Sequence, residues 1–214
     1  MSIKEIVQGF QKELDEKDRI REEVLSNSRT AVRLSKQAVM ATHRGELAEA
    51  EKILDQALKS LDQIRESSSK YQELFYHGAV TVAFQEYAEA QTFYNFVKNG
   101  EFLDPKEFGI PTIPYLLGVA DMVGELRRRA LDRLRIGDLE GAETCLQMME
   151  DIYTELISLK SVYNLASNLR RKCDVARHLI EATRGEVTVE TRNSVLKKSL
   201  EDLEKKITEK SKNP

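Results

Sequence analysis

Residues 74–97 read LFYHGAVTVAFQEYAEAQTFYNFV, and Glu86 and Glu89 are the only charged residues in this stretch. Its apolar residues recur at the spacing of a helix rather than in the strict alternation of a half-buried strand. A helix that is apolar around most of its circumference belongs in a protein interior. The stretch therefore predicts a core helix that carries one pair of carboxylates, with other helices packed around it.

A second stretch repeats this pattern. Residues 108–126 read FGIPTIPYLLGVADMVGEL, and their only charged residues are Asp121 and Glu125. The i,i+4 spacing of this pair, like the i,i+3 spacing of Glu86 and Glu89, places both side chains on one helix face, one turn apart. We therefore expect a second core helix with its own pair of acids.

Helical spacing continues over almost the whole chain, and glycines mark the ends of several segments. The predicted helices cover residues 2–44, 47–66, 71–98, 115–135, 138–159, 163–183 and 188–207, with Asp138 and Thr188 as N-caps and Gly185 as a stop. The predicted fold is all-α: a seven-helix bundle in one domain over residues 1–207, followed by a frayed tail over residues 208–214. The first helix would be ~65 Å long, which is more than one small domain covers, so we expect it to project or to pack on a neighbouring subunit.

Composition limits the class of protein. Of the 214 residues 32% are charged and 41% are hydrophobic, and no run approaches the ~18 apolar residues of a membrane span. The N-terminus lacks a signal-peptide core, and Cys145 and Cys173 have neither metal nor redox spacing. We expect a soluble cytoplasmic protein with no membrane association. The net charge of −3 excludes a uniformly basic nucleic-acid binder, but not a local basic surface.

The acid pairs are candidate metal ligands. Buried carboxylates must be paired, protonated or bound to a cation, and two converging pairs would repel unless a divalent ion neutralised them. The candidate ligands Glu86, Glu89, Asp121 and Glu125 offer only oxygen, which suits Mg²⁺ or Mn²⁺ better than Zn²⁺. No Glu-x-x-His sequence of the di-iron bundle type is present. The alternative is that each pair faces solvent or forms ion pairs with arginines, since the sequence does not show that the two helices cross.

Basic residues form a stripe on the first predicted helix, where Arg29, Arg33 and Lys36 follow i,i+4,i+7 spacing. Arg128 and Arg129 lie three and four residues after Glu125, on the acidic face of their helix. A row of cations beside carboxylates suits a site that holds backbone phosphates next to a metal ion. The alternative is a solvated charged face and an arginine-rich helix end that complements the helix dipole.

His77 is the one histidine in the uncharged stretch. It is more typical of a packed core histidine than of a catalytic base. Because it lies in the same helical segment as Glu86, it is also a candidate RNA contact.

Two segments carry a resemblance to a known family. The combination of FQEYAEAQTF (residues 84–93) with the later YLLGVADMVGELRRR (residues 115–129) resembles the translin family. The closer match is the catalytic branch, translin-associated factor X, which carries LQEYVEA and then YLLGVADLTGEL in the same order. The segments DRIREEV (residues 18–24) and LRRKCDVARHLIEATRGE (residues 169–186) are weaker similarities.

The resemblance implies a site and an assembly. The family's metal-binding acids correspond to Glu86, Glu89 and Asp121, with Glu125 as the fourth acid of the same motif. Translin itself lacks the acid equivalent to Asp121, so its presence here favours the nuclease branch. The family fold is a seven-helix bundle that assembles into hollow octameric barrels with RNA on a basic inner surface.

The resulting expectation is a Mg²⁺-dependent endoribonuclease, with Mn²⁺ as the alternative ion. It would cleave single-stranded or short duplex RNA inside a closed homo-oligomer of eight subunits, with Arg128 as the nearest phosphate contact. One alternative is a non-catalytic oligomer that binds RNA or single-stranded DNA and uses the acids as internal ion-pair partners. The other is a helical scaffold for protein partners.

Overall fold

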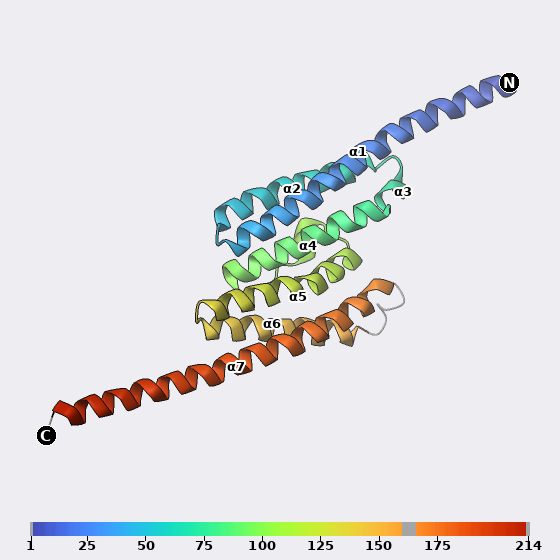
Figure 1. The fold of residues 1–214 in the computed structure, drawn as a ribbon. Helices are drawn as coiled ribbons and strands as arrows, with labels where there is room; N and C mark the ends of the chain where they lie inside the picture. Colours follow the sequence, from blue (N-terminus) through green and yellow to red (C-terminus); the bar gives the residue numbers. More distant parts are fainter. Residues whose placement is uncertain (1, 160–165, 213–214) are drawn as a thin grey trace. The chain divides into compact units, whose positions relative to one another are not determined.

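The computed structural model describes residues 2–159 and 166–212. These residues form seven α-helices and one 3₁₀ helix, and no strand occurs among them (Figure 1). The elements are α1 (Ile3–His43), α2 (Leu47–Ser67), α3 (Gln72–Phe75), α4 (Gly78–Asn99), η1 (Pro105–Phe108), α5 (Thr112–Arg135), α6 (Leu139–Ser158) and α7 (Ser167–Lys212). The predicted all-α, seven-helix fold is confirmed, although several helix boundaries differ from the prediction. No helix in the described part of the chain is both long and apolar enough to cross a bilayer.

The described chain divides into two compact units, which we describe separately. The first takes in residues 2–122 and 166–169, and the second takes in residues 123–159 and 170–212. Helix α5 contributes residues to both units. The predicted single domain over residues 1–207 stays a prediction.

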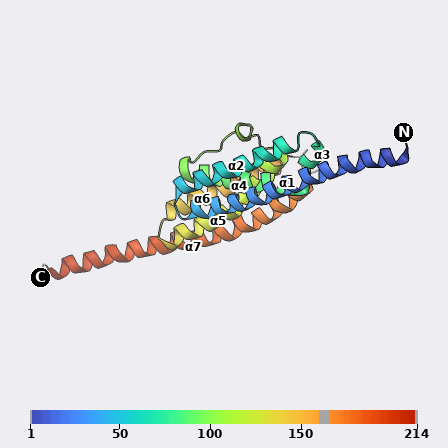
Figure 2. The same ribbon diagram turned by 90° about the horizontal axis from the view of Figure 1, so that it is seen from above.

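In the first unit α1 packs against α2 and α4 (Figures 1 and 2). The packed part of α1 buries a row of apolar residues that includes Val24, Ala31 and Ala38. The first turns of α1 extend past α2 and α3, and Val7 and Phe10 there are exposed. Ser2 closes the start of the helix with a capping box, because its hydroxyl accepts a hydrogen bond from the Glu5 N–H and its own N–H donates to the Glu5 carboxylate.

The predicted helix over residues 71–98 is wrong in one respect, because it is interrupted at His77. The His77 backbone is extended, with φ −66° and ψ 141°, and α4 begins at the next residue. The Nδ1 atom of His77 accepts a hydrogen bond from the backbone N–H of Ala79 at 3.1 Å. His77 is therefore an exposed N-cap of α4, and its interpretation as a packed core histidine is also wrong.

The connection between α4 and α5 is anchored by Arg65 of α2. Its Nη2 donates to the backbone oxygens of Phe108, at 2.7 Å, and Gly109, at 2.9 Å. Its guanidinium also lies 5.0 Å from the ring centre of Phe84. These contacts hold η1 against α2 and α4. Helix α5 starts at Thr112 rather than Tyr115, since a proline is tolerated in the first turn of a helix.

In the second unit α6 and α7 pack with the later part of α5. Arg127 of α5 donates to Thr183 Oγ1 at 2.7 Å and to the Glu186 carboxylate at 3.0 Å. Cys145 and Cys173 are buried and form no disulfide in the described part of the chain, as expected of small apolar fillers.

The predicted break between a sixth and a seventh helix is wrong. Helix α7 continues through Gly185, and the Thr188 hydroxyl donates to the Arg184 carbonyl within the helix instead of capping a new one. Burial of Thr183 and Val187 on either side of Gly185 holds this segment in the bundle. The predicted start at residue 163 lies outside the described residues.

Candidate functional site

Helices α4 and α5 approach each other closely at Gly118. A Cβ atom added there would lie 2.5 Å from the Gln85 backbone oxygen and 2.8 Å from the Glu89 backbone nitrogen. Both contacts are with backbone, which cannot move aside cheaply, so only glycine permits this crossing. Asp121 lies one turn after Gly118. The crossing therefore brings the Glu86–Glu89 segment of α4 face to face with the segment of α5 that carries Asp121.

Two of the carboxylates have specific partners in the first unit. Gln85 Nε2 donates a hydrogen bond to Asp121 Oδ2 at 2.7 Å, across the α4–α5 crossing. Lys36 Nζ of α1 lies 3.7 Å from Glu86 Oε1, and the Glu86 side chain is 20% exposed. Glu89 is half-buried like the others. The acids thus lie at the edge of the bundle, within reach of solvent, rather than deep in the core.

Glu125 follows Asp121 by one turn of α5 and belongs to the second unit. It is half-buried as well.

The donor chemistry of these residues fits Mg²⁺, although the ligand set is not gathered. Over residues 2–159 and 166–212, no three His, Cys, Asp or Glu side chains come together as a metal site. All the candidate ligands are carboxylates, which Mg²⁺ prefers, and the Lys36 ammonium already places a positive charge beside Glu86. The Gln85 amide holds Asp121 in a fixed orientation, as partners of metal-ligating carboxylates do. The site is therefore chemically suited to a divalent cation.

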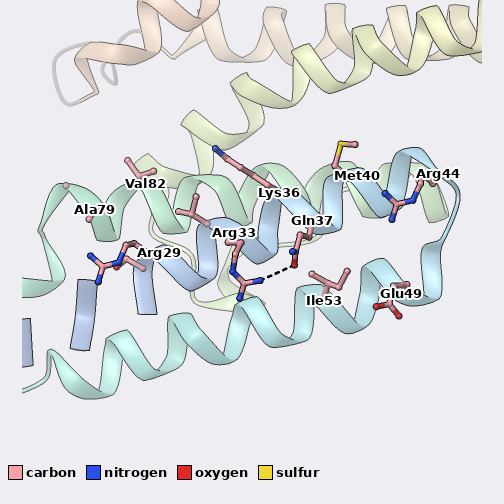
Figure 3. A pocket seen from close by; sticks show the side chains of 13 residues that line it. Arg29, Arg33, Lys36, Gln37, Met40, Arg44, Glu49, Ile53, Ala79 and Val82 are labelled. Atoms are coloured by element: carbon pink, nitrogen blue, oxygen red, sulfur yellow. Dashed lines mark hydrogen bonds between the residues drawn. The ribbon is translucent and has the colours of Figure 1, made fainter. Parts of the chain in front are cut away.

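A groove of about 1130 Å³ lies over α1, between α2 and α4 (Figure 3). The predicted basic stripe lines it, since Arg29, Arg33 and Lys36 of α1 are all among its lining residues. Arg33 donates to Gln37 Oε1 at 3.4 Å. Apolar and small side chains complete the groove: Val32 and Met40 of α1, Ile53 of α2, and Ala79 and Val82 of α4.

Lys36 connects the groove to the acids. It lines the groove and also forms the ion pair with Glu86. The basic stripe and the first acid pair are therefore neighbours in one unit. A ligand that carries phosphates and apolar bases matches this lining of cations and hydrocarbon.

The other predicted RNA contacts are Arg128 and Arg129 of α5 and His77 at the start of α4. Arg128 is exposed on α5, whereas Arg129 is half-buried next to Cys145 of α6. Burial lowers the pKa of Arg129, and the nearby Arg133 adds to this effect. His77 caps α4. The structure thus places Lys36 of the basic stripe beside Glu86, whereas Arg129 packs against α6.

Sequence reasoning missed two residues of the site, Gly118 and Gln85. A signal for Gly118 was present, because a glycine inside a helix costs ~1 kcal/mol relative to alanine and therefore calls for a reason. For Gln85 there was none. The side chain of a glutamine next to an acidic pair gives no hint of its partner on another helix.

The profile of the translin family matches residues 19–183, which is more than half of the chain. This chain belongs to the translin family. The resemblance predicted from the two acidic segments is thereby confirmed. Residues 184–212 of α7 lie beyond the matched range.

Known relatives agree with this assignment. A chain of AfC3PO, solved in complex with duplex RNA, superposes with a TM-score of 0.81 and 33% identity, covering 88% of this chain and 98% of that one. An uncharacterized protein of Methanocaldococcus jannaschii is 30% identical in an alignment of 192 residues that covers 87% of this chain and 83% of that protein. Translin-associated protein X of Rattus norvegicus is 27% identical in an alignment of 185 residues that covers 68% of this chain and 64% of its own length. This chain therefore spans less than two thirds of the rat relative.

Proposed function

We propose that this translin-family protein is an RNA-binding homo-oligomer that cleaves phosphodiester bonds. The observation that carries the proposal is the position of Lys36, which lines the basic groove and pairs with Glu86 at 3.7 Å. Phosphates held along the groove would lie next to the acids of the α4–α5 crossing. The relative AfC3PO, whose structure contains duplex RNA, supports RNA as the ligand.

Binding would depend on the exposed cations of α1. Arg29 and Arg33 would contact backbone phosphates, and Met40 and Val82 would contact sugars or bases. Because phosphate contacts release counterions, RNA affinity should fall steeply as the salt concentration rises. The proposed ligand is single-stranded or short duplex RNA.

Cleavage would depend on the acids. Glu86, Glu89 and Asp121 would hold Mg²⁺, with Glu125 as a fourth carboxylate and Mn²⁺ as a substitute ion. When bound, the ion would lower the pKa of the attacking water and neutralise charge on the leaving oxygen. Gln85 would keep Asp121 oriented, and Lys36 would hold a phosphate beside Glu86.

Assembly into an oligomer would explain how a protein with a net negative charge can bind RNA. The net charge is −3, yet the groove is basic. In a closed homo-oligomer of eight copies, several grooves would face one cavity and their fields would add. Arg128 would then be a second phosphate contact, and the exposed start of α1, with Val7 and Phe10, would be available for subunit contacts.

The deciding experiment is cleavage of labelled RNA by the full chain with Mg²⁺, with EDTA and in matched variants. Glu89→Gln keeps the size of the side chain and removes the charge, so it should lower the cleavage rate by about 100-fold or more. Glu143→Gln, an exposed acid on α6, is the control and should cleave normally. RNA binding should survive in both variants.

Two results would contradict the metal mechanism: cleavage that persists in EDTA, or a folded Glu89→Gln variant with full activity. Salt-sensitive binding of RNA or single-stranded DNA without any turnover would establish the alternative. The acids would then serve as internal partners, as Glu86 does for Lys36 and Asp121 for Gln85.

A further inference from the structure

Helix α7 carries two apolar seams in succession. The first consists of Cys173, Ala176, Ile180, Thr183 and Val187, which are all buried. Their spacing of three and four residues is that of a helix packed along one face. This seam holds α7 in the second unit.

The first seam ends at Val187. The positions that would continue it are polar, namely Glu190, Ser194 and Lys197. Exposed apolar side chains continue instead along a different face, on which Val175, 48% exposed, already lies two heptads before Val189. Beyond Val187 this row consists of Val189, Leu196, Leu200, Leu203 and Ile207, and these side chains are 54–59% exposed.

The second seam is displaced from the first by one residue, which rotates it by about 100° around the helix axis. It therefore cannot rest on the helices that bury Val187. In Figure 2 this part of α7 runs on past the end of α6. Residues 189–207 also lie outside the family match, which ends at residue 183.

The second seam follows a heptad repeat. Val189, Leu196 and Leu203 occupy position d, while Leu200 and Ile207 occupy position a. Asn193 is the one polar residue at position a.

We propose that residues 196–207 of α7 pair with the same residues of a second copy of this chain, as an antiparallel coiled coil. In the favoured register Leu200 packs beside Leu203 of the second copy, and Leu196 packs beside Ile207. The two-fold axis repeats each layer, so four apolar layers form without Asn193.

Charge complementarity selects this arrangement. In the antiparallel pair, position e faces position e, so Lys197 lies beside Glu204 of the second copy, and the symmetry makes this contact twice. In a parallel pair, position g faces position e, and Arg192 would lie beside Lys197, which is a like-charge contact.

The register is selected in the same way. A shift by one heptad toward the start of the segment would place Asn193 against Leu203 and bring Glu190 beside Glu204. The first contact leaves a polar group in an apolar layer, and the second is repulsive.

Zero-length carbodiimide cross-linking of the full chain tests the pairing, with ¹⁴N and ¹⁵N copies mixed before reaction. Within one helix Lys197 and Glu204 are about 10 Å apart, too far for a direct amide bond. A Lys197–Glu204 cross-link that joins one light and one heavy peptide is therefore expected only from the proposed pair. Leu200→Glu should abolish it, whereas Val195→Glu, an exposed apolar residue off the seam, should leave it unchanged.

Reversing the charges of Lys197 and Glu204 tests whether the two helices are antiparallel. Analytical ultracentrifugation measures the self-association, and the step to follow is the one that Leu200→Glu abolishes. Lys197→Glu should weaken this step about tenfold, Glu204→Lys should do the same, and the double variant should restore it. A stronger association in Lys197→Glu would overturn the antiparallel pair in favour of a parallel one. Absence of mixed-isotope cross-links, or cross-links from residues 189–207 to residues 3–14 of α1, would overturn the self-pairing itself.

Discussion

The α4–α5 crossing and the end of α7 differ in how much of their packing a single chain supplies. At the crossing a single added carbon at Gly118 would lie 2.5 Å from a backbone oxygen. Along residues 189–207 the seam leucines are more than half exposed. The crossing is complete within one subunit, whereas the seam needs a second copy to be buried.

The match to the translin family covers the α4–α5 crossing but not the exposed end of α7. It includes Gly118, Glu89 and Asp121, and it ends before the second seam of α7. The exposed start of α1 is a third case, because Val7, Phe10 and Leu14 prolong the three-and-four spacing of the seam that buries Val24. The exposed residues at the end of α7 lie instead on a face other than the one that buries Val187, so they point to a contact outside the subunit.

The largest expected effect is at the crossing. Gly118→Ala should destabilise the chain by ~1–3 kcal/mol, because the backbone of α4 must move away from the added methyl group. RNA cleavage should fall with it, since the displacement separates Asp121 from Gln85. Thermal unfolding followed by circular dichroism measures the first effect, and the RNA assay measures the second.

Gly124 in the same helix is the matched control, because nothing lies within 4 Å of its Cβ position. Gly124→Ala should stabilise α5 by ~0.4–1 kcal/mol, because the unfolded chain loses conformational freedom. Equal effects of the two substitutions would show that the close approach at Gly118 does not govern the crossing.

A smaller effect is expected at the start of α4. His77→Ala removes the acceptor for the Ala79 N–H and should cost ~0.5–2 kcal/mol of stability, as loss of an N-cap does. His77→Asn provides a new capping oxygen and should restore stability. If His77 also contacts RNA, the asparagine variant should recover its melting temperature but not its RNA affinity. Equal stability of the alanine variant and the original chain would rule out the capping role.

Much of this architecture could be predicted from the helical periodicity of apolar residues and from the glycines at helix ends. Gly45, Gly100 and Gly137 follow the ends of helices with positive φ, as expected of C-terminal caps. The acidic pairs were found because long uncharged stretches surround them. These signals depend only on residues close together in the sequence, so the sequence alone is enough to detect them.

The wrong predictions concern positions at which tertiary contacts determine where a helix begins or ends. The apolar pattern runs unbroken across His77, so nothing in the sequence marks the extended backbone there. Gly185 has the form of a helix stop, yet burial of Val187 and the hydrogen bond between Arg127 and Thr183 keep α7 intact. The position of Lys36 beside Glu86 joins residues distant in sequence, and no spacing rule reaches that far.

The smallest expected effect on the subunit itself is at the second seam. Leu200→Glu replaces an exposed leucine, so in dilute solution the free energy of unfolding should change by no more than ~0.5 kcal/mol. At high protein concentration the original chain should gain stability, because self-association binds only the folded state. The variant should lose this dependence on concentration. Urea unfolding at two protein concentrations measures both quantities. A variant that is destabilised even at the lower concentration would show that Leu200 packs within its own chain, and the contrast with Gly118 would no longer hold.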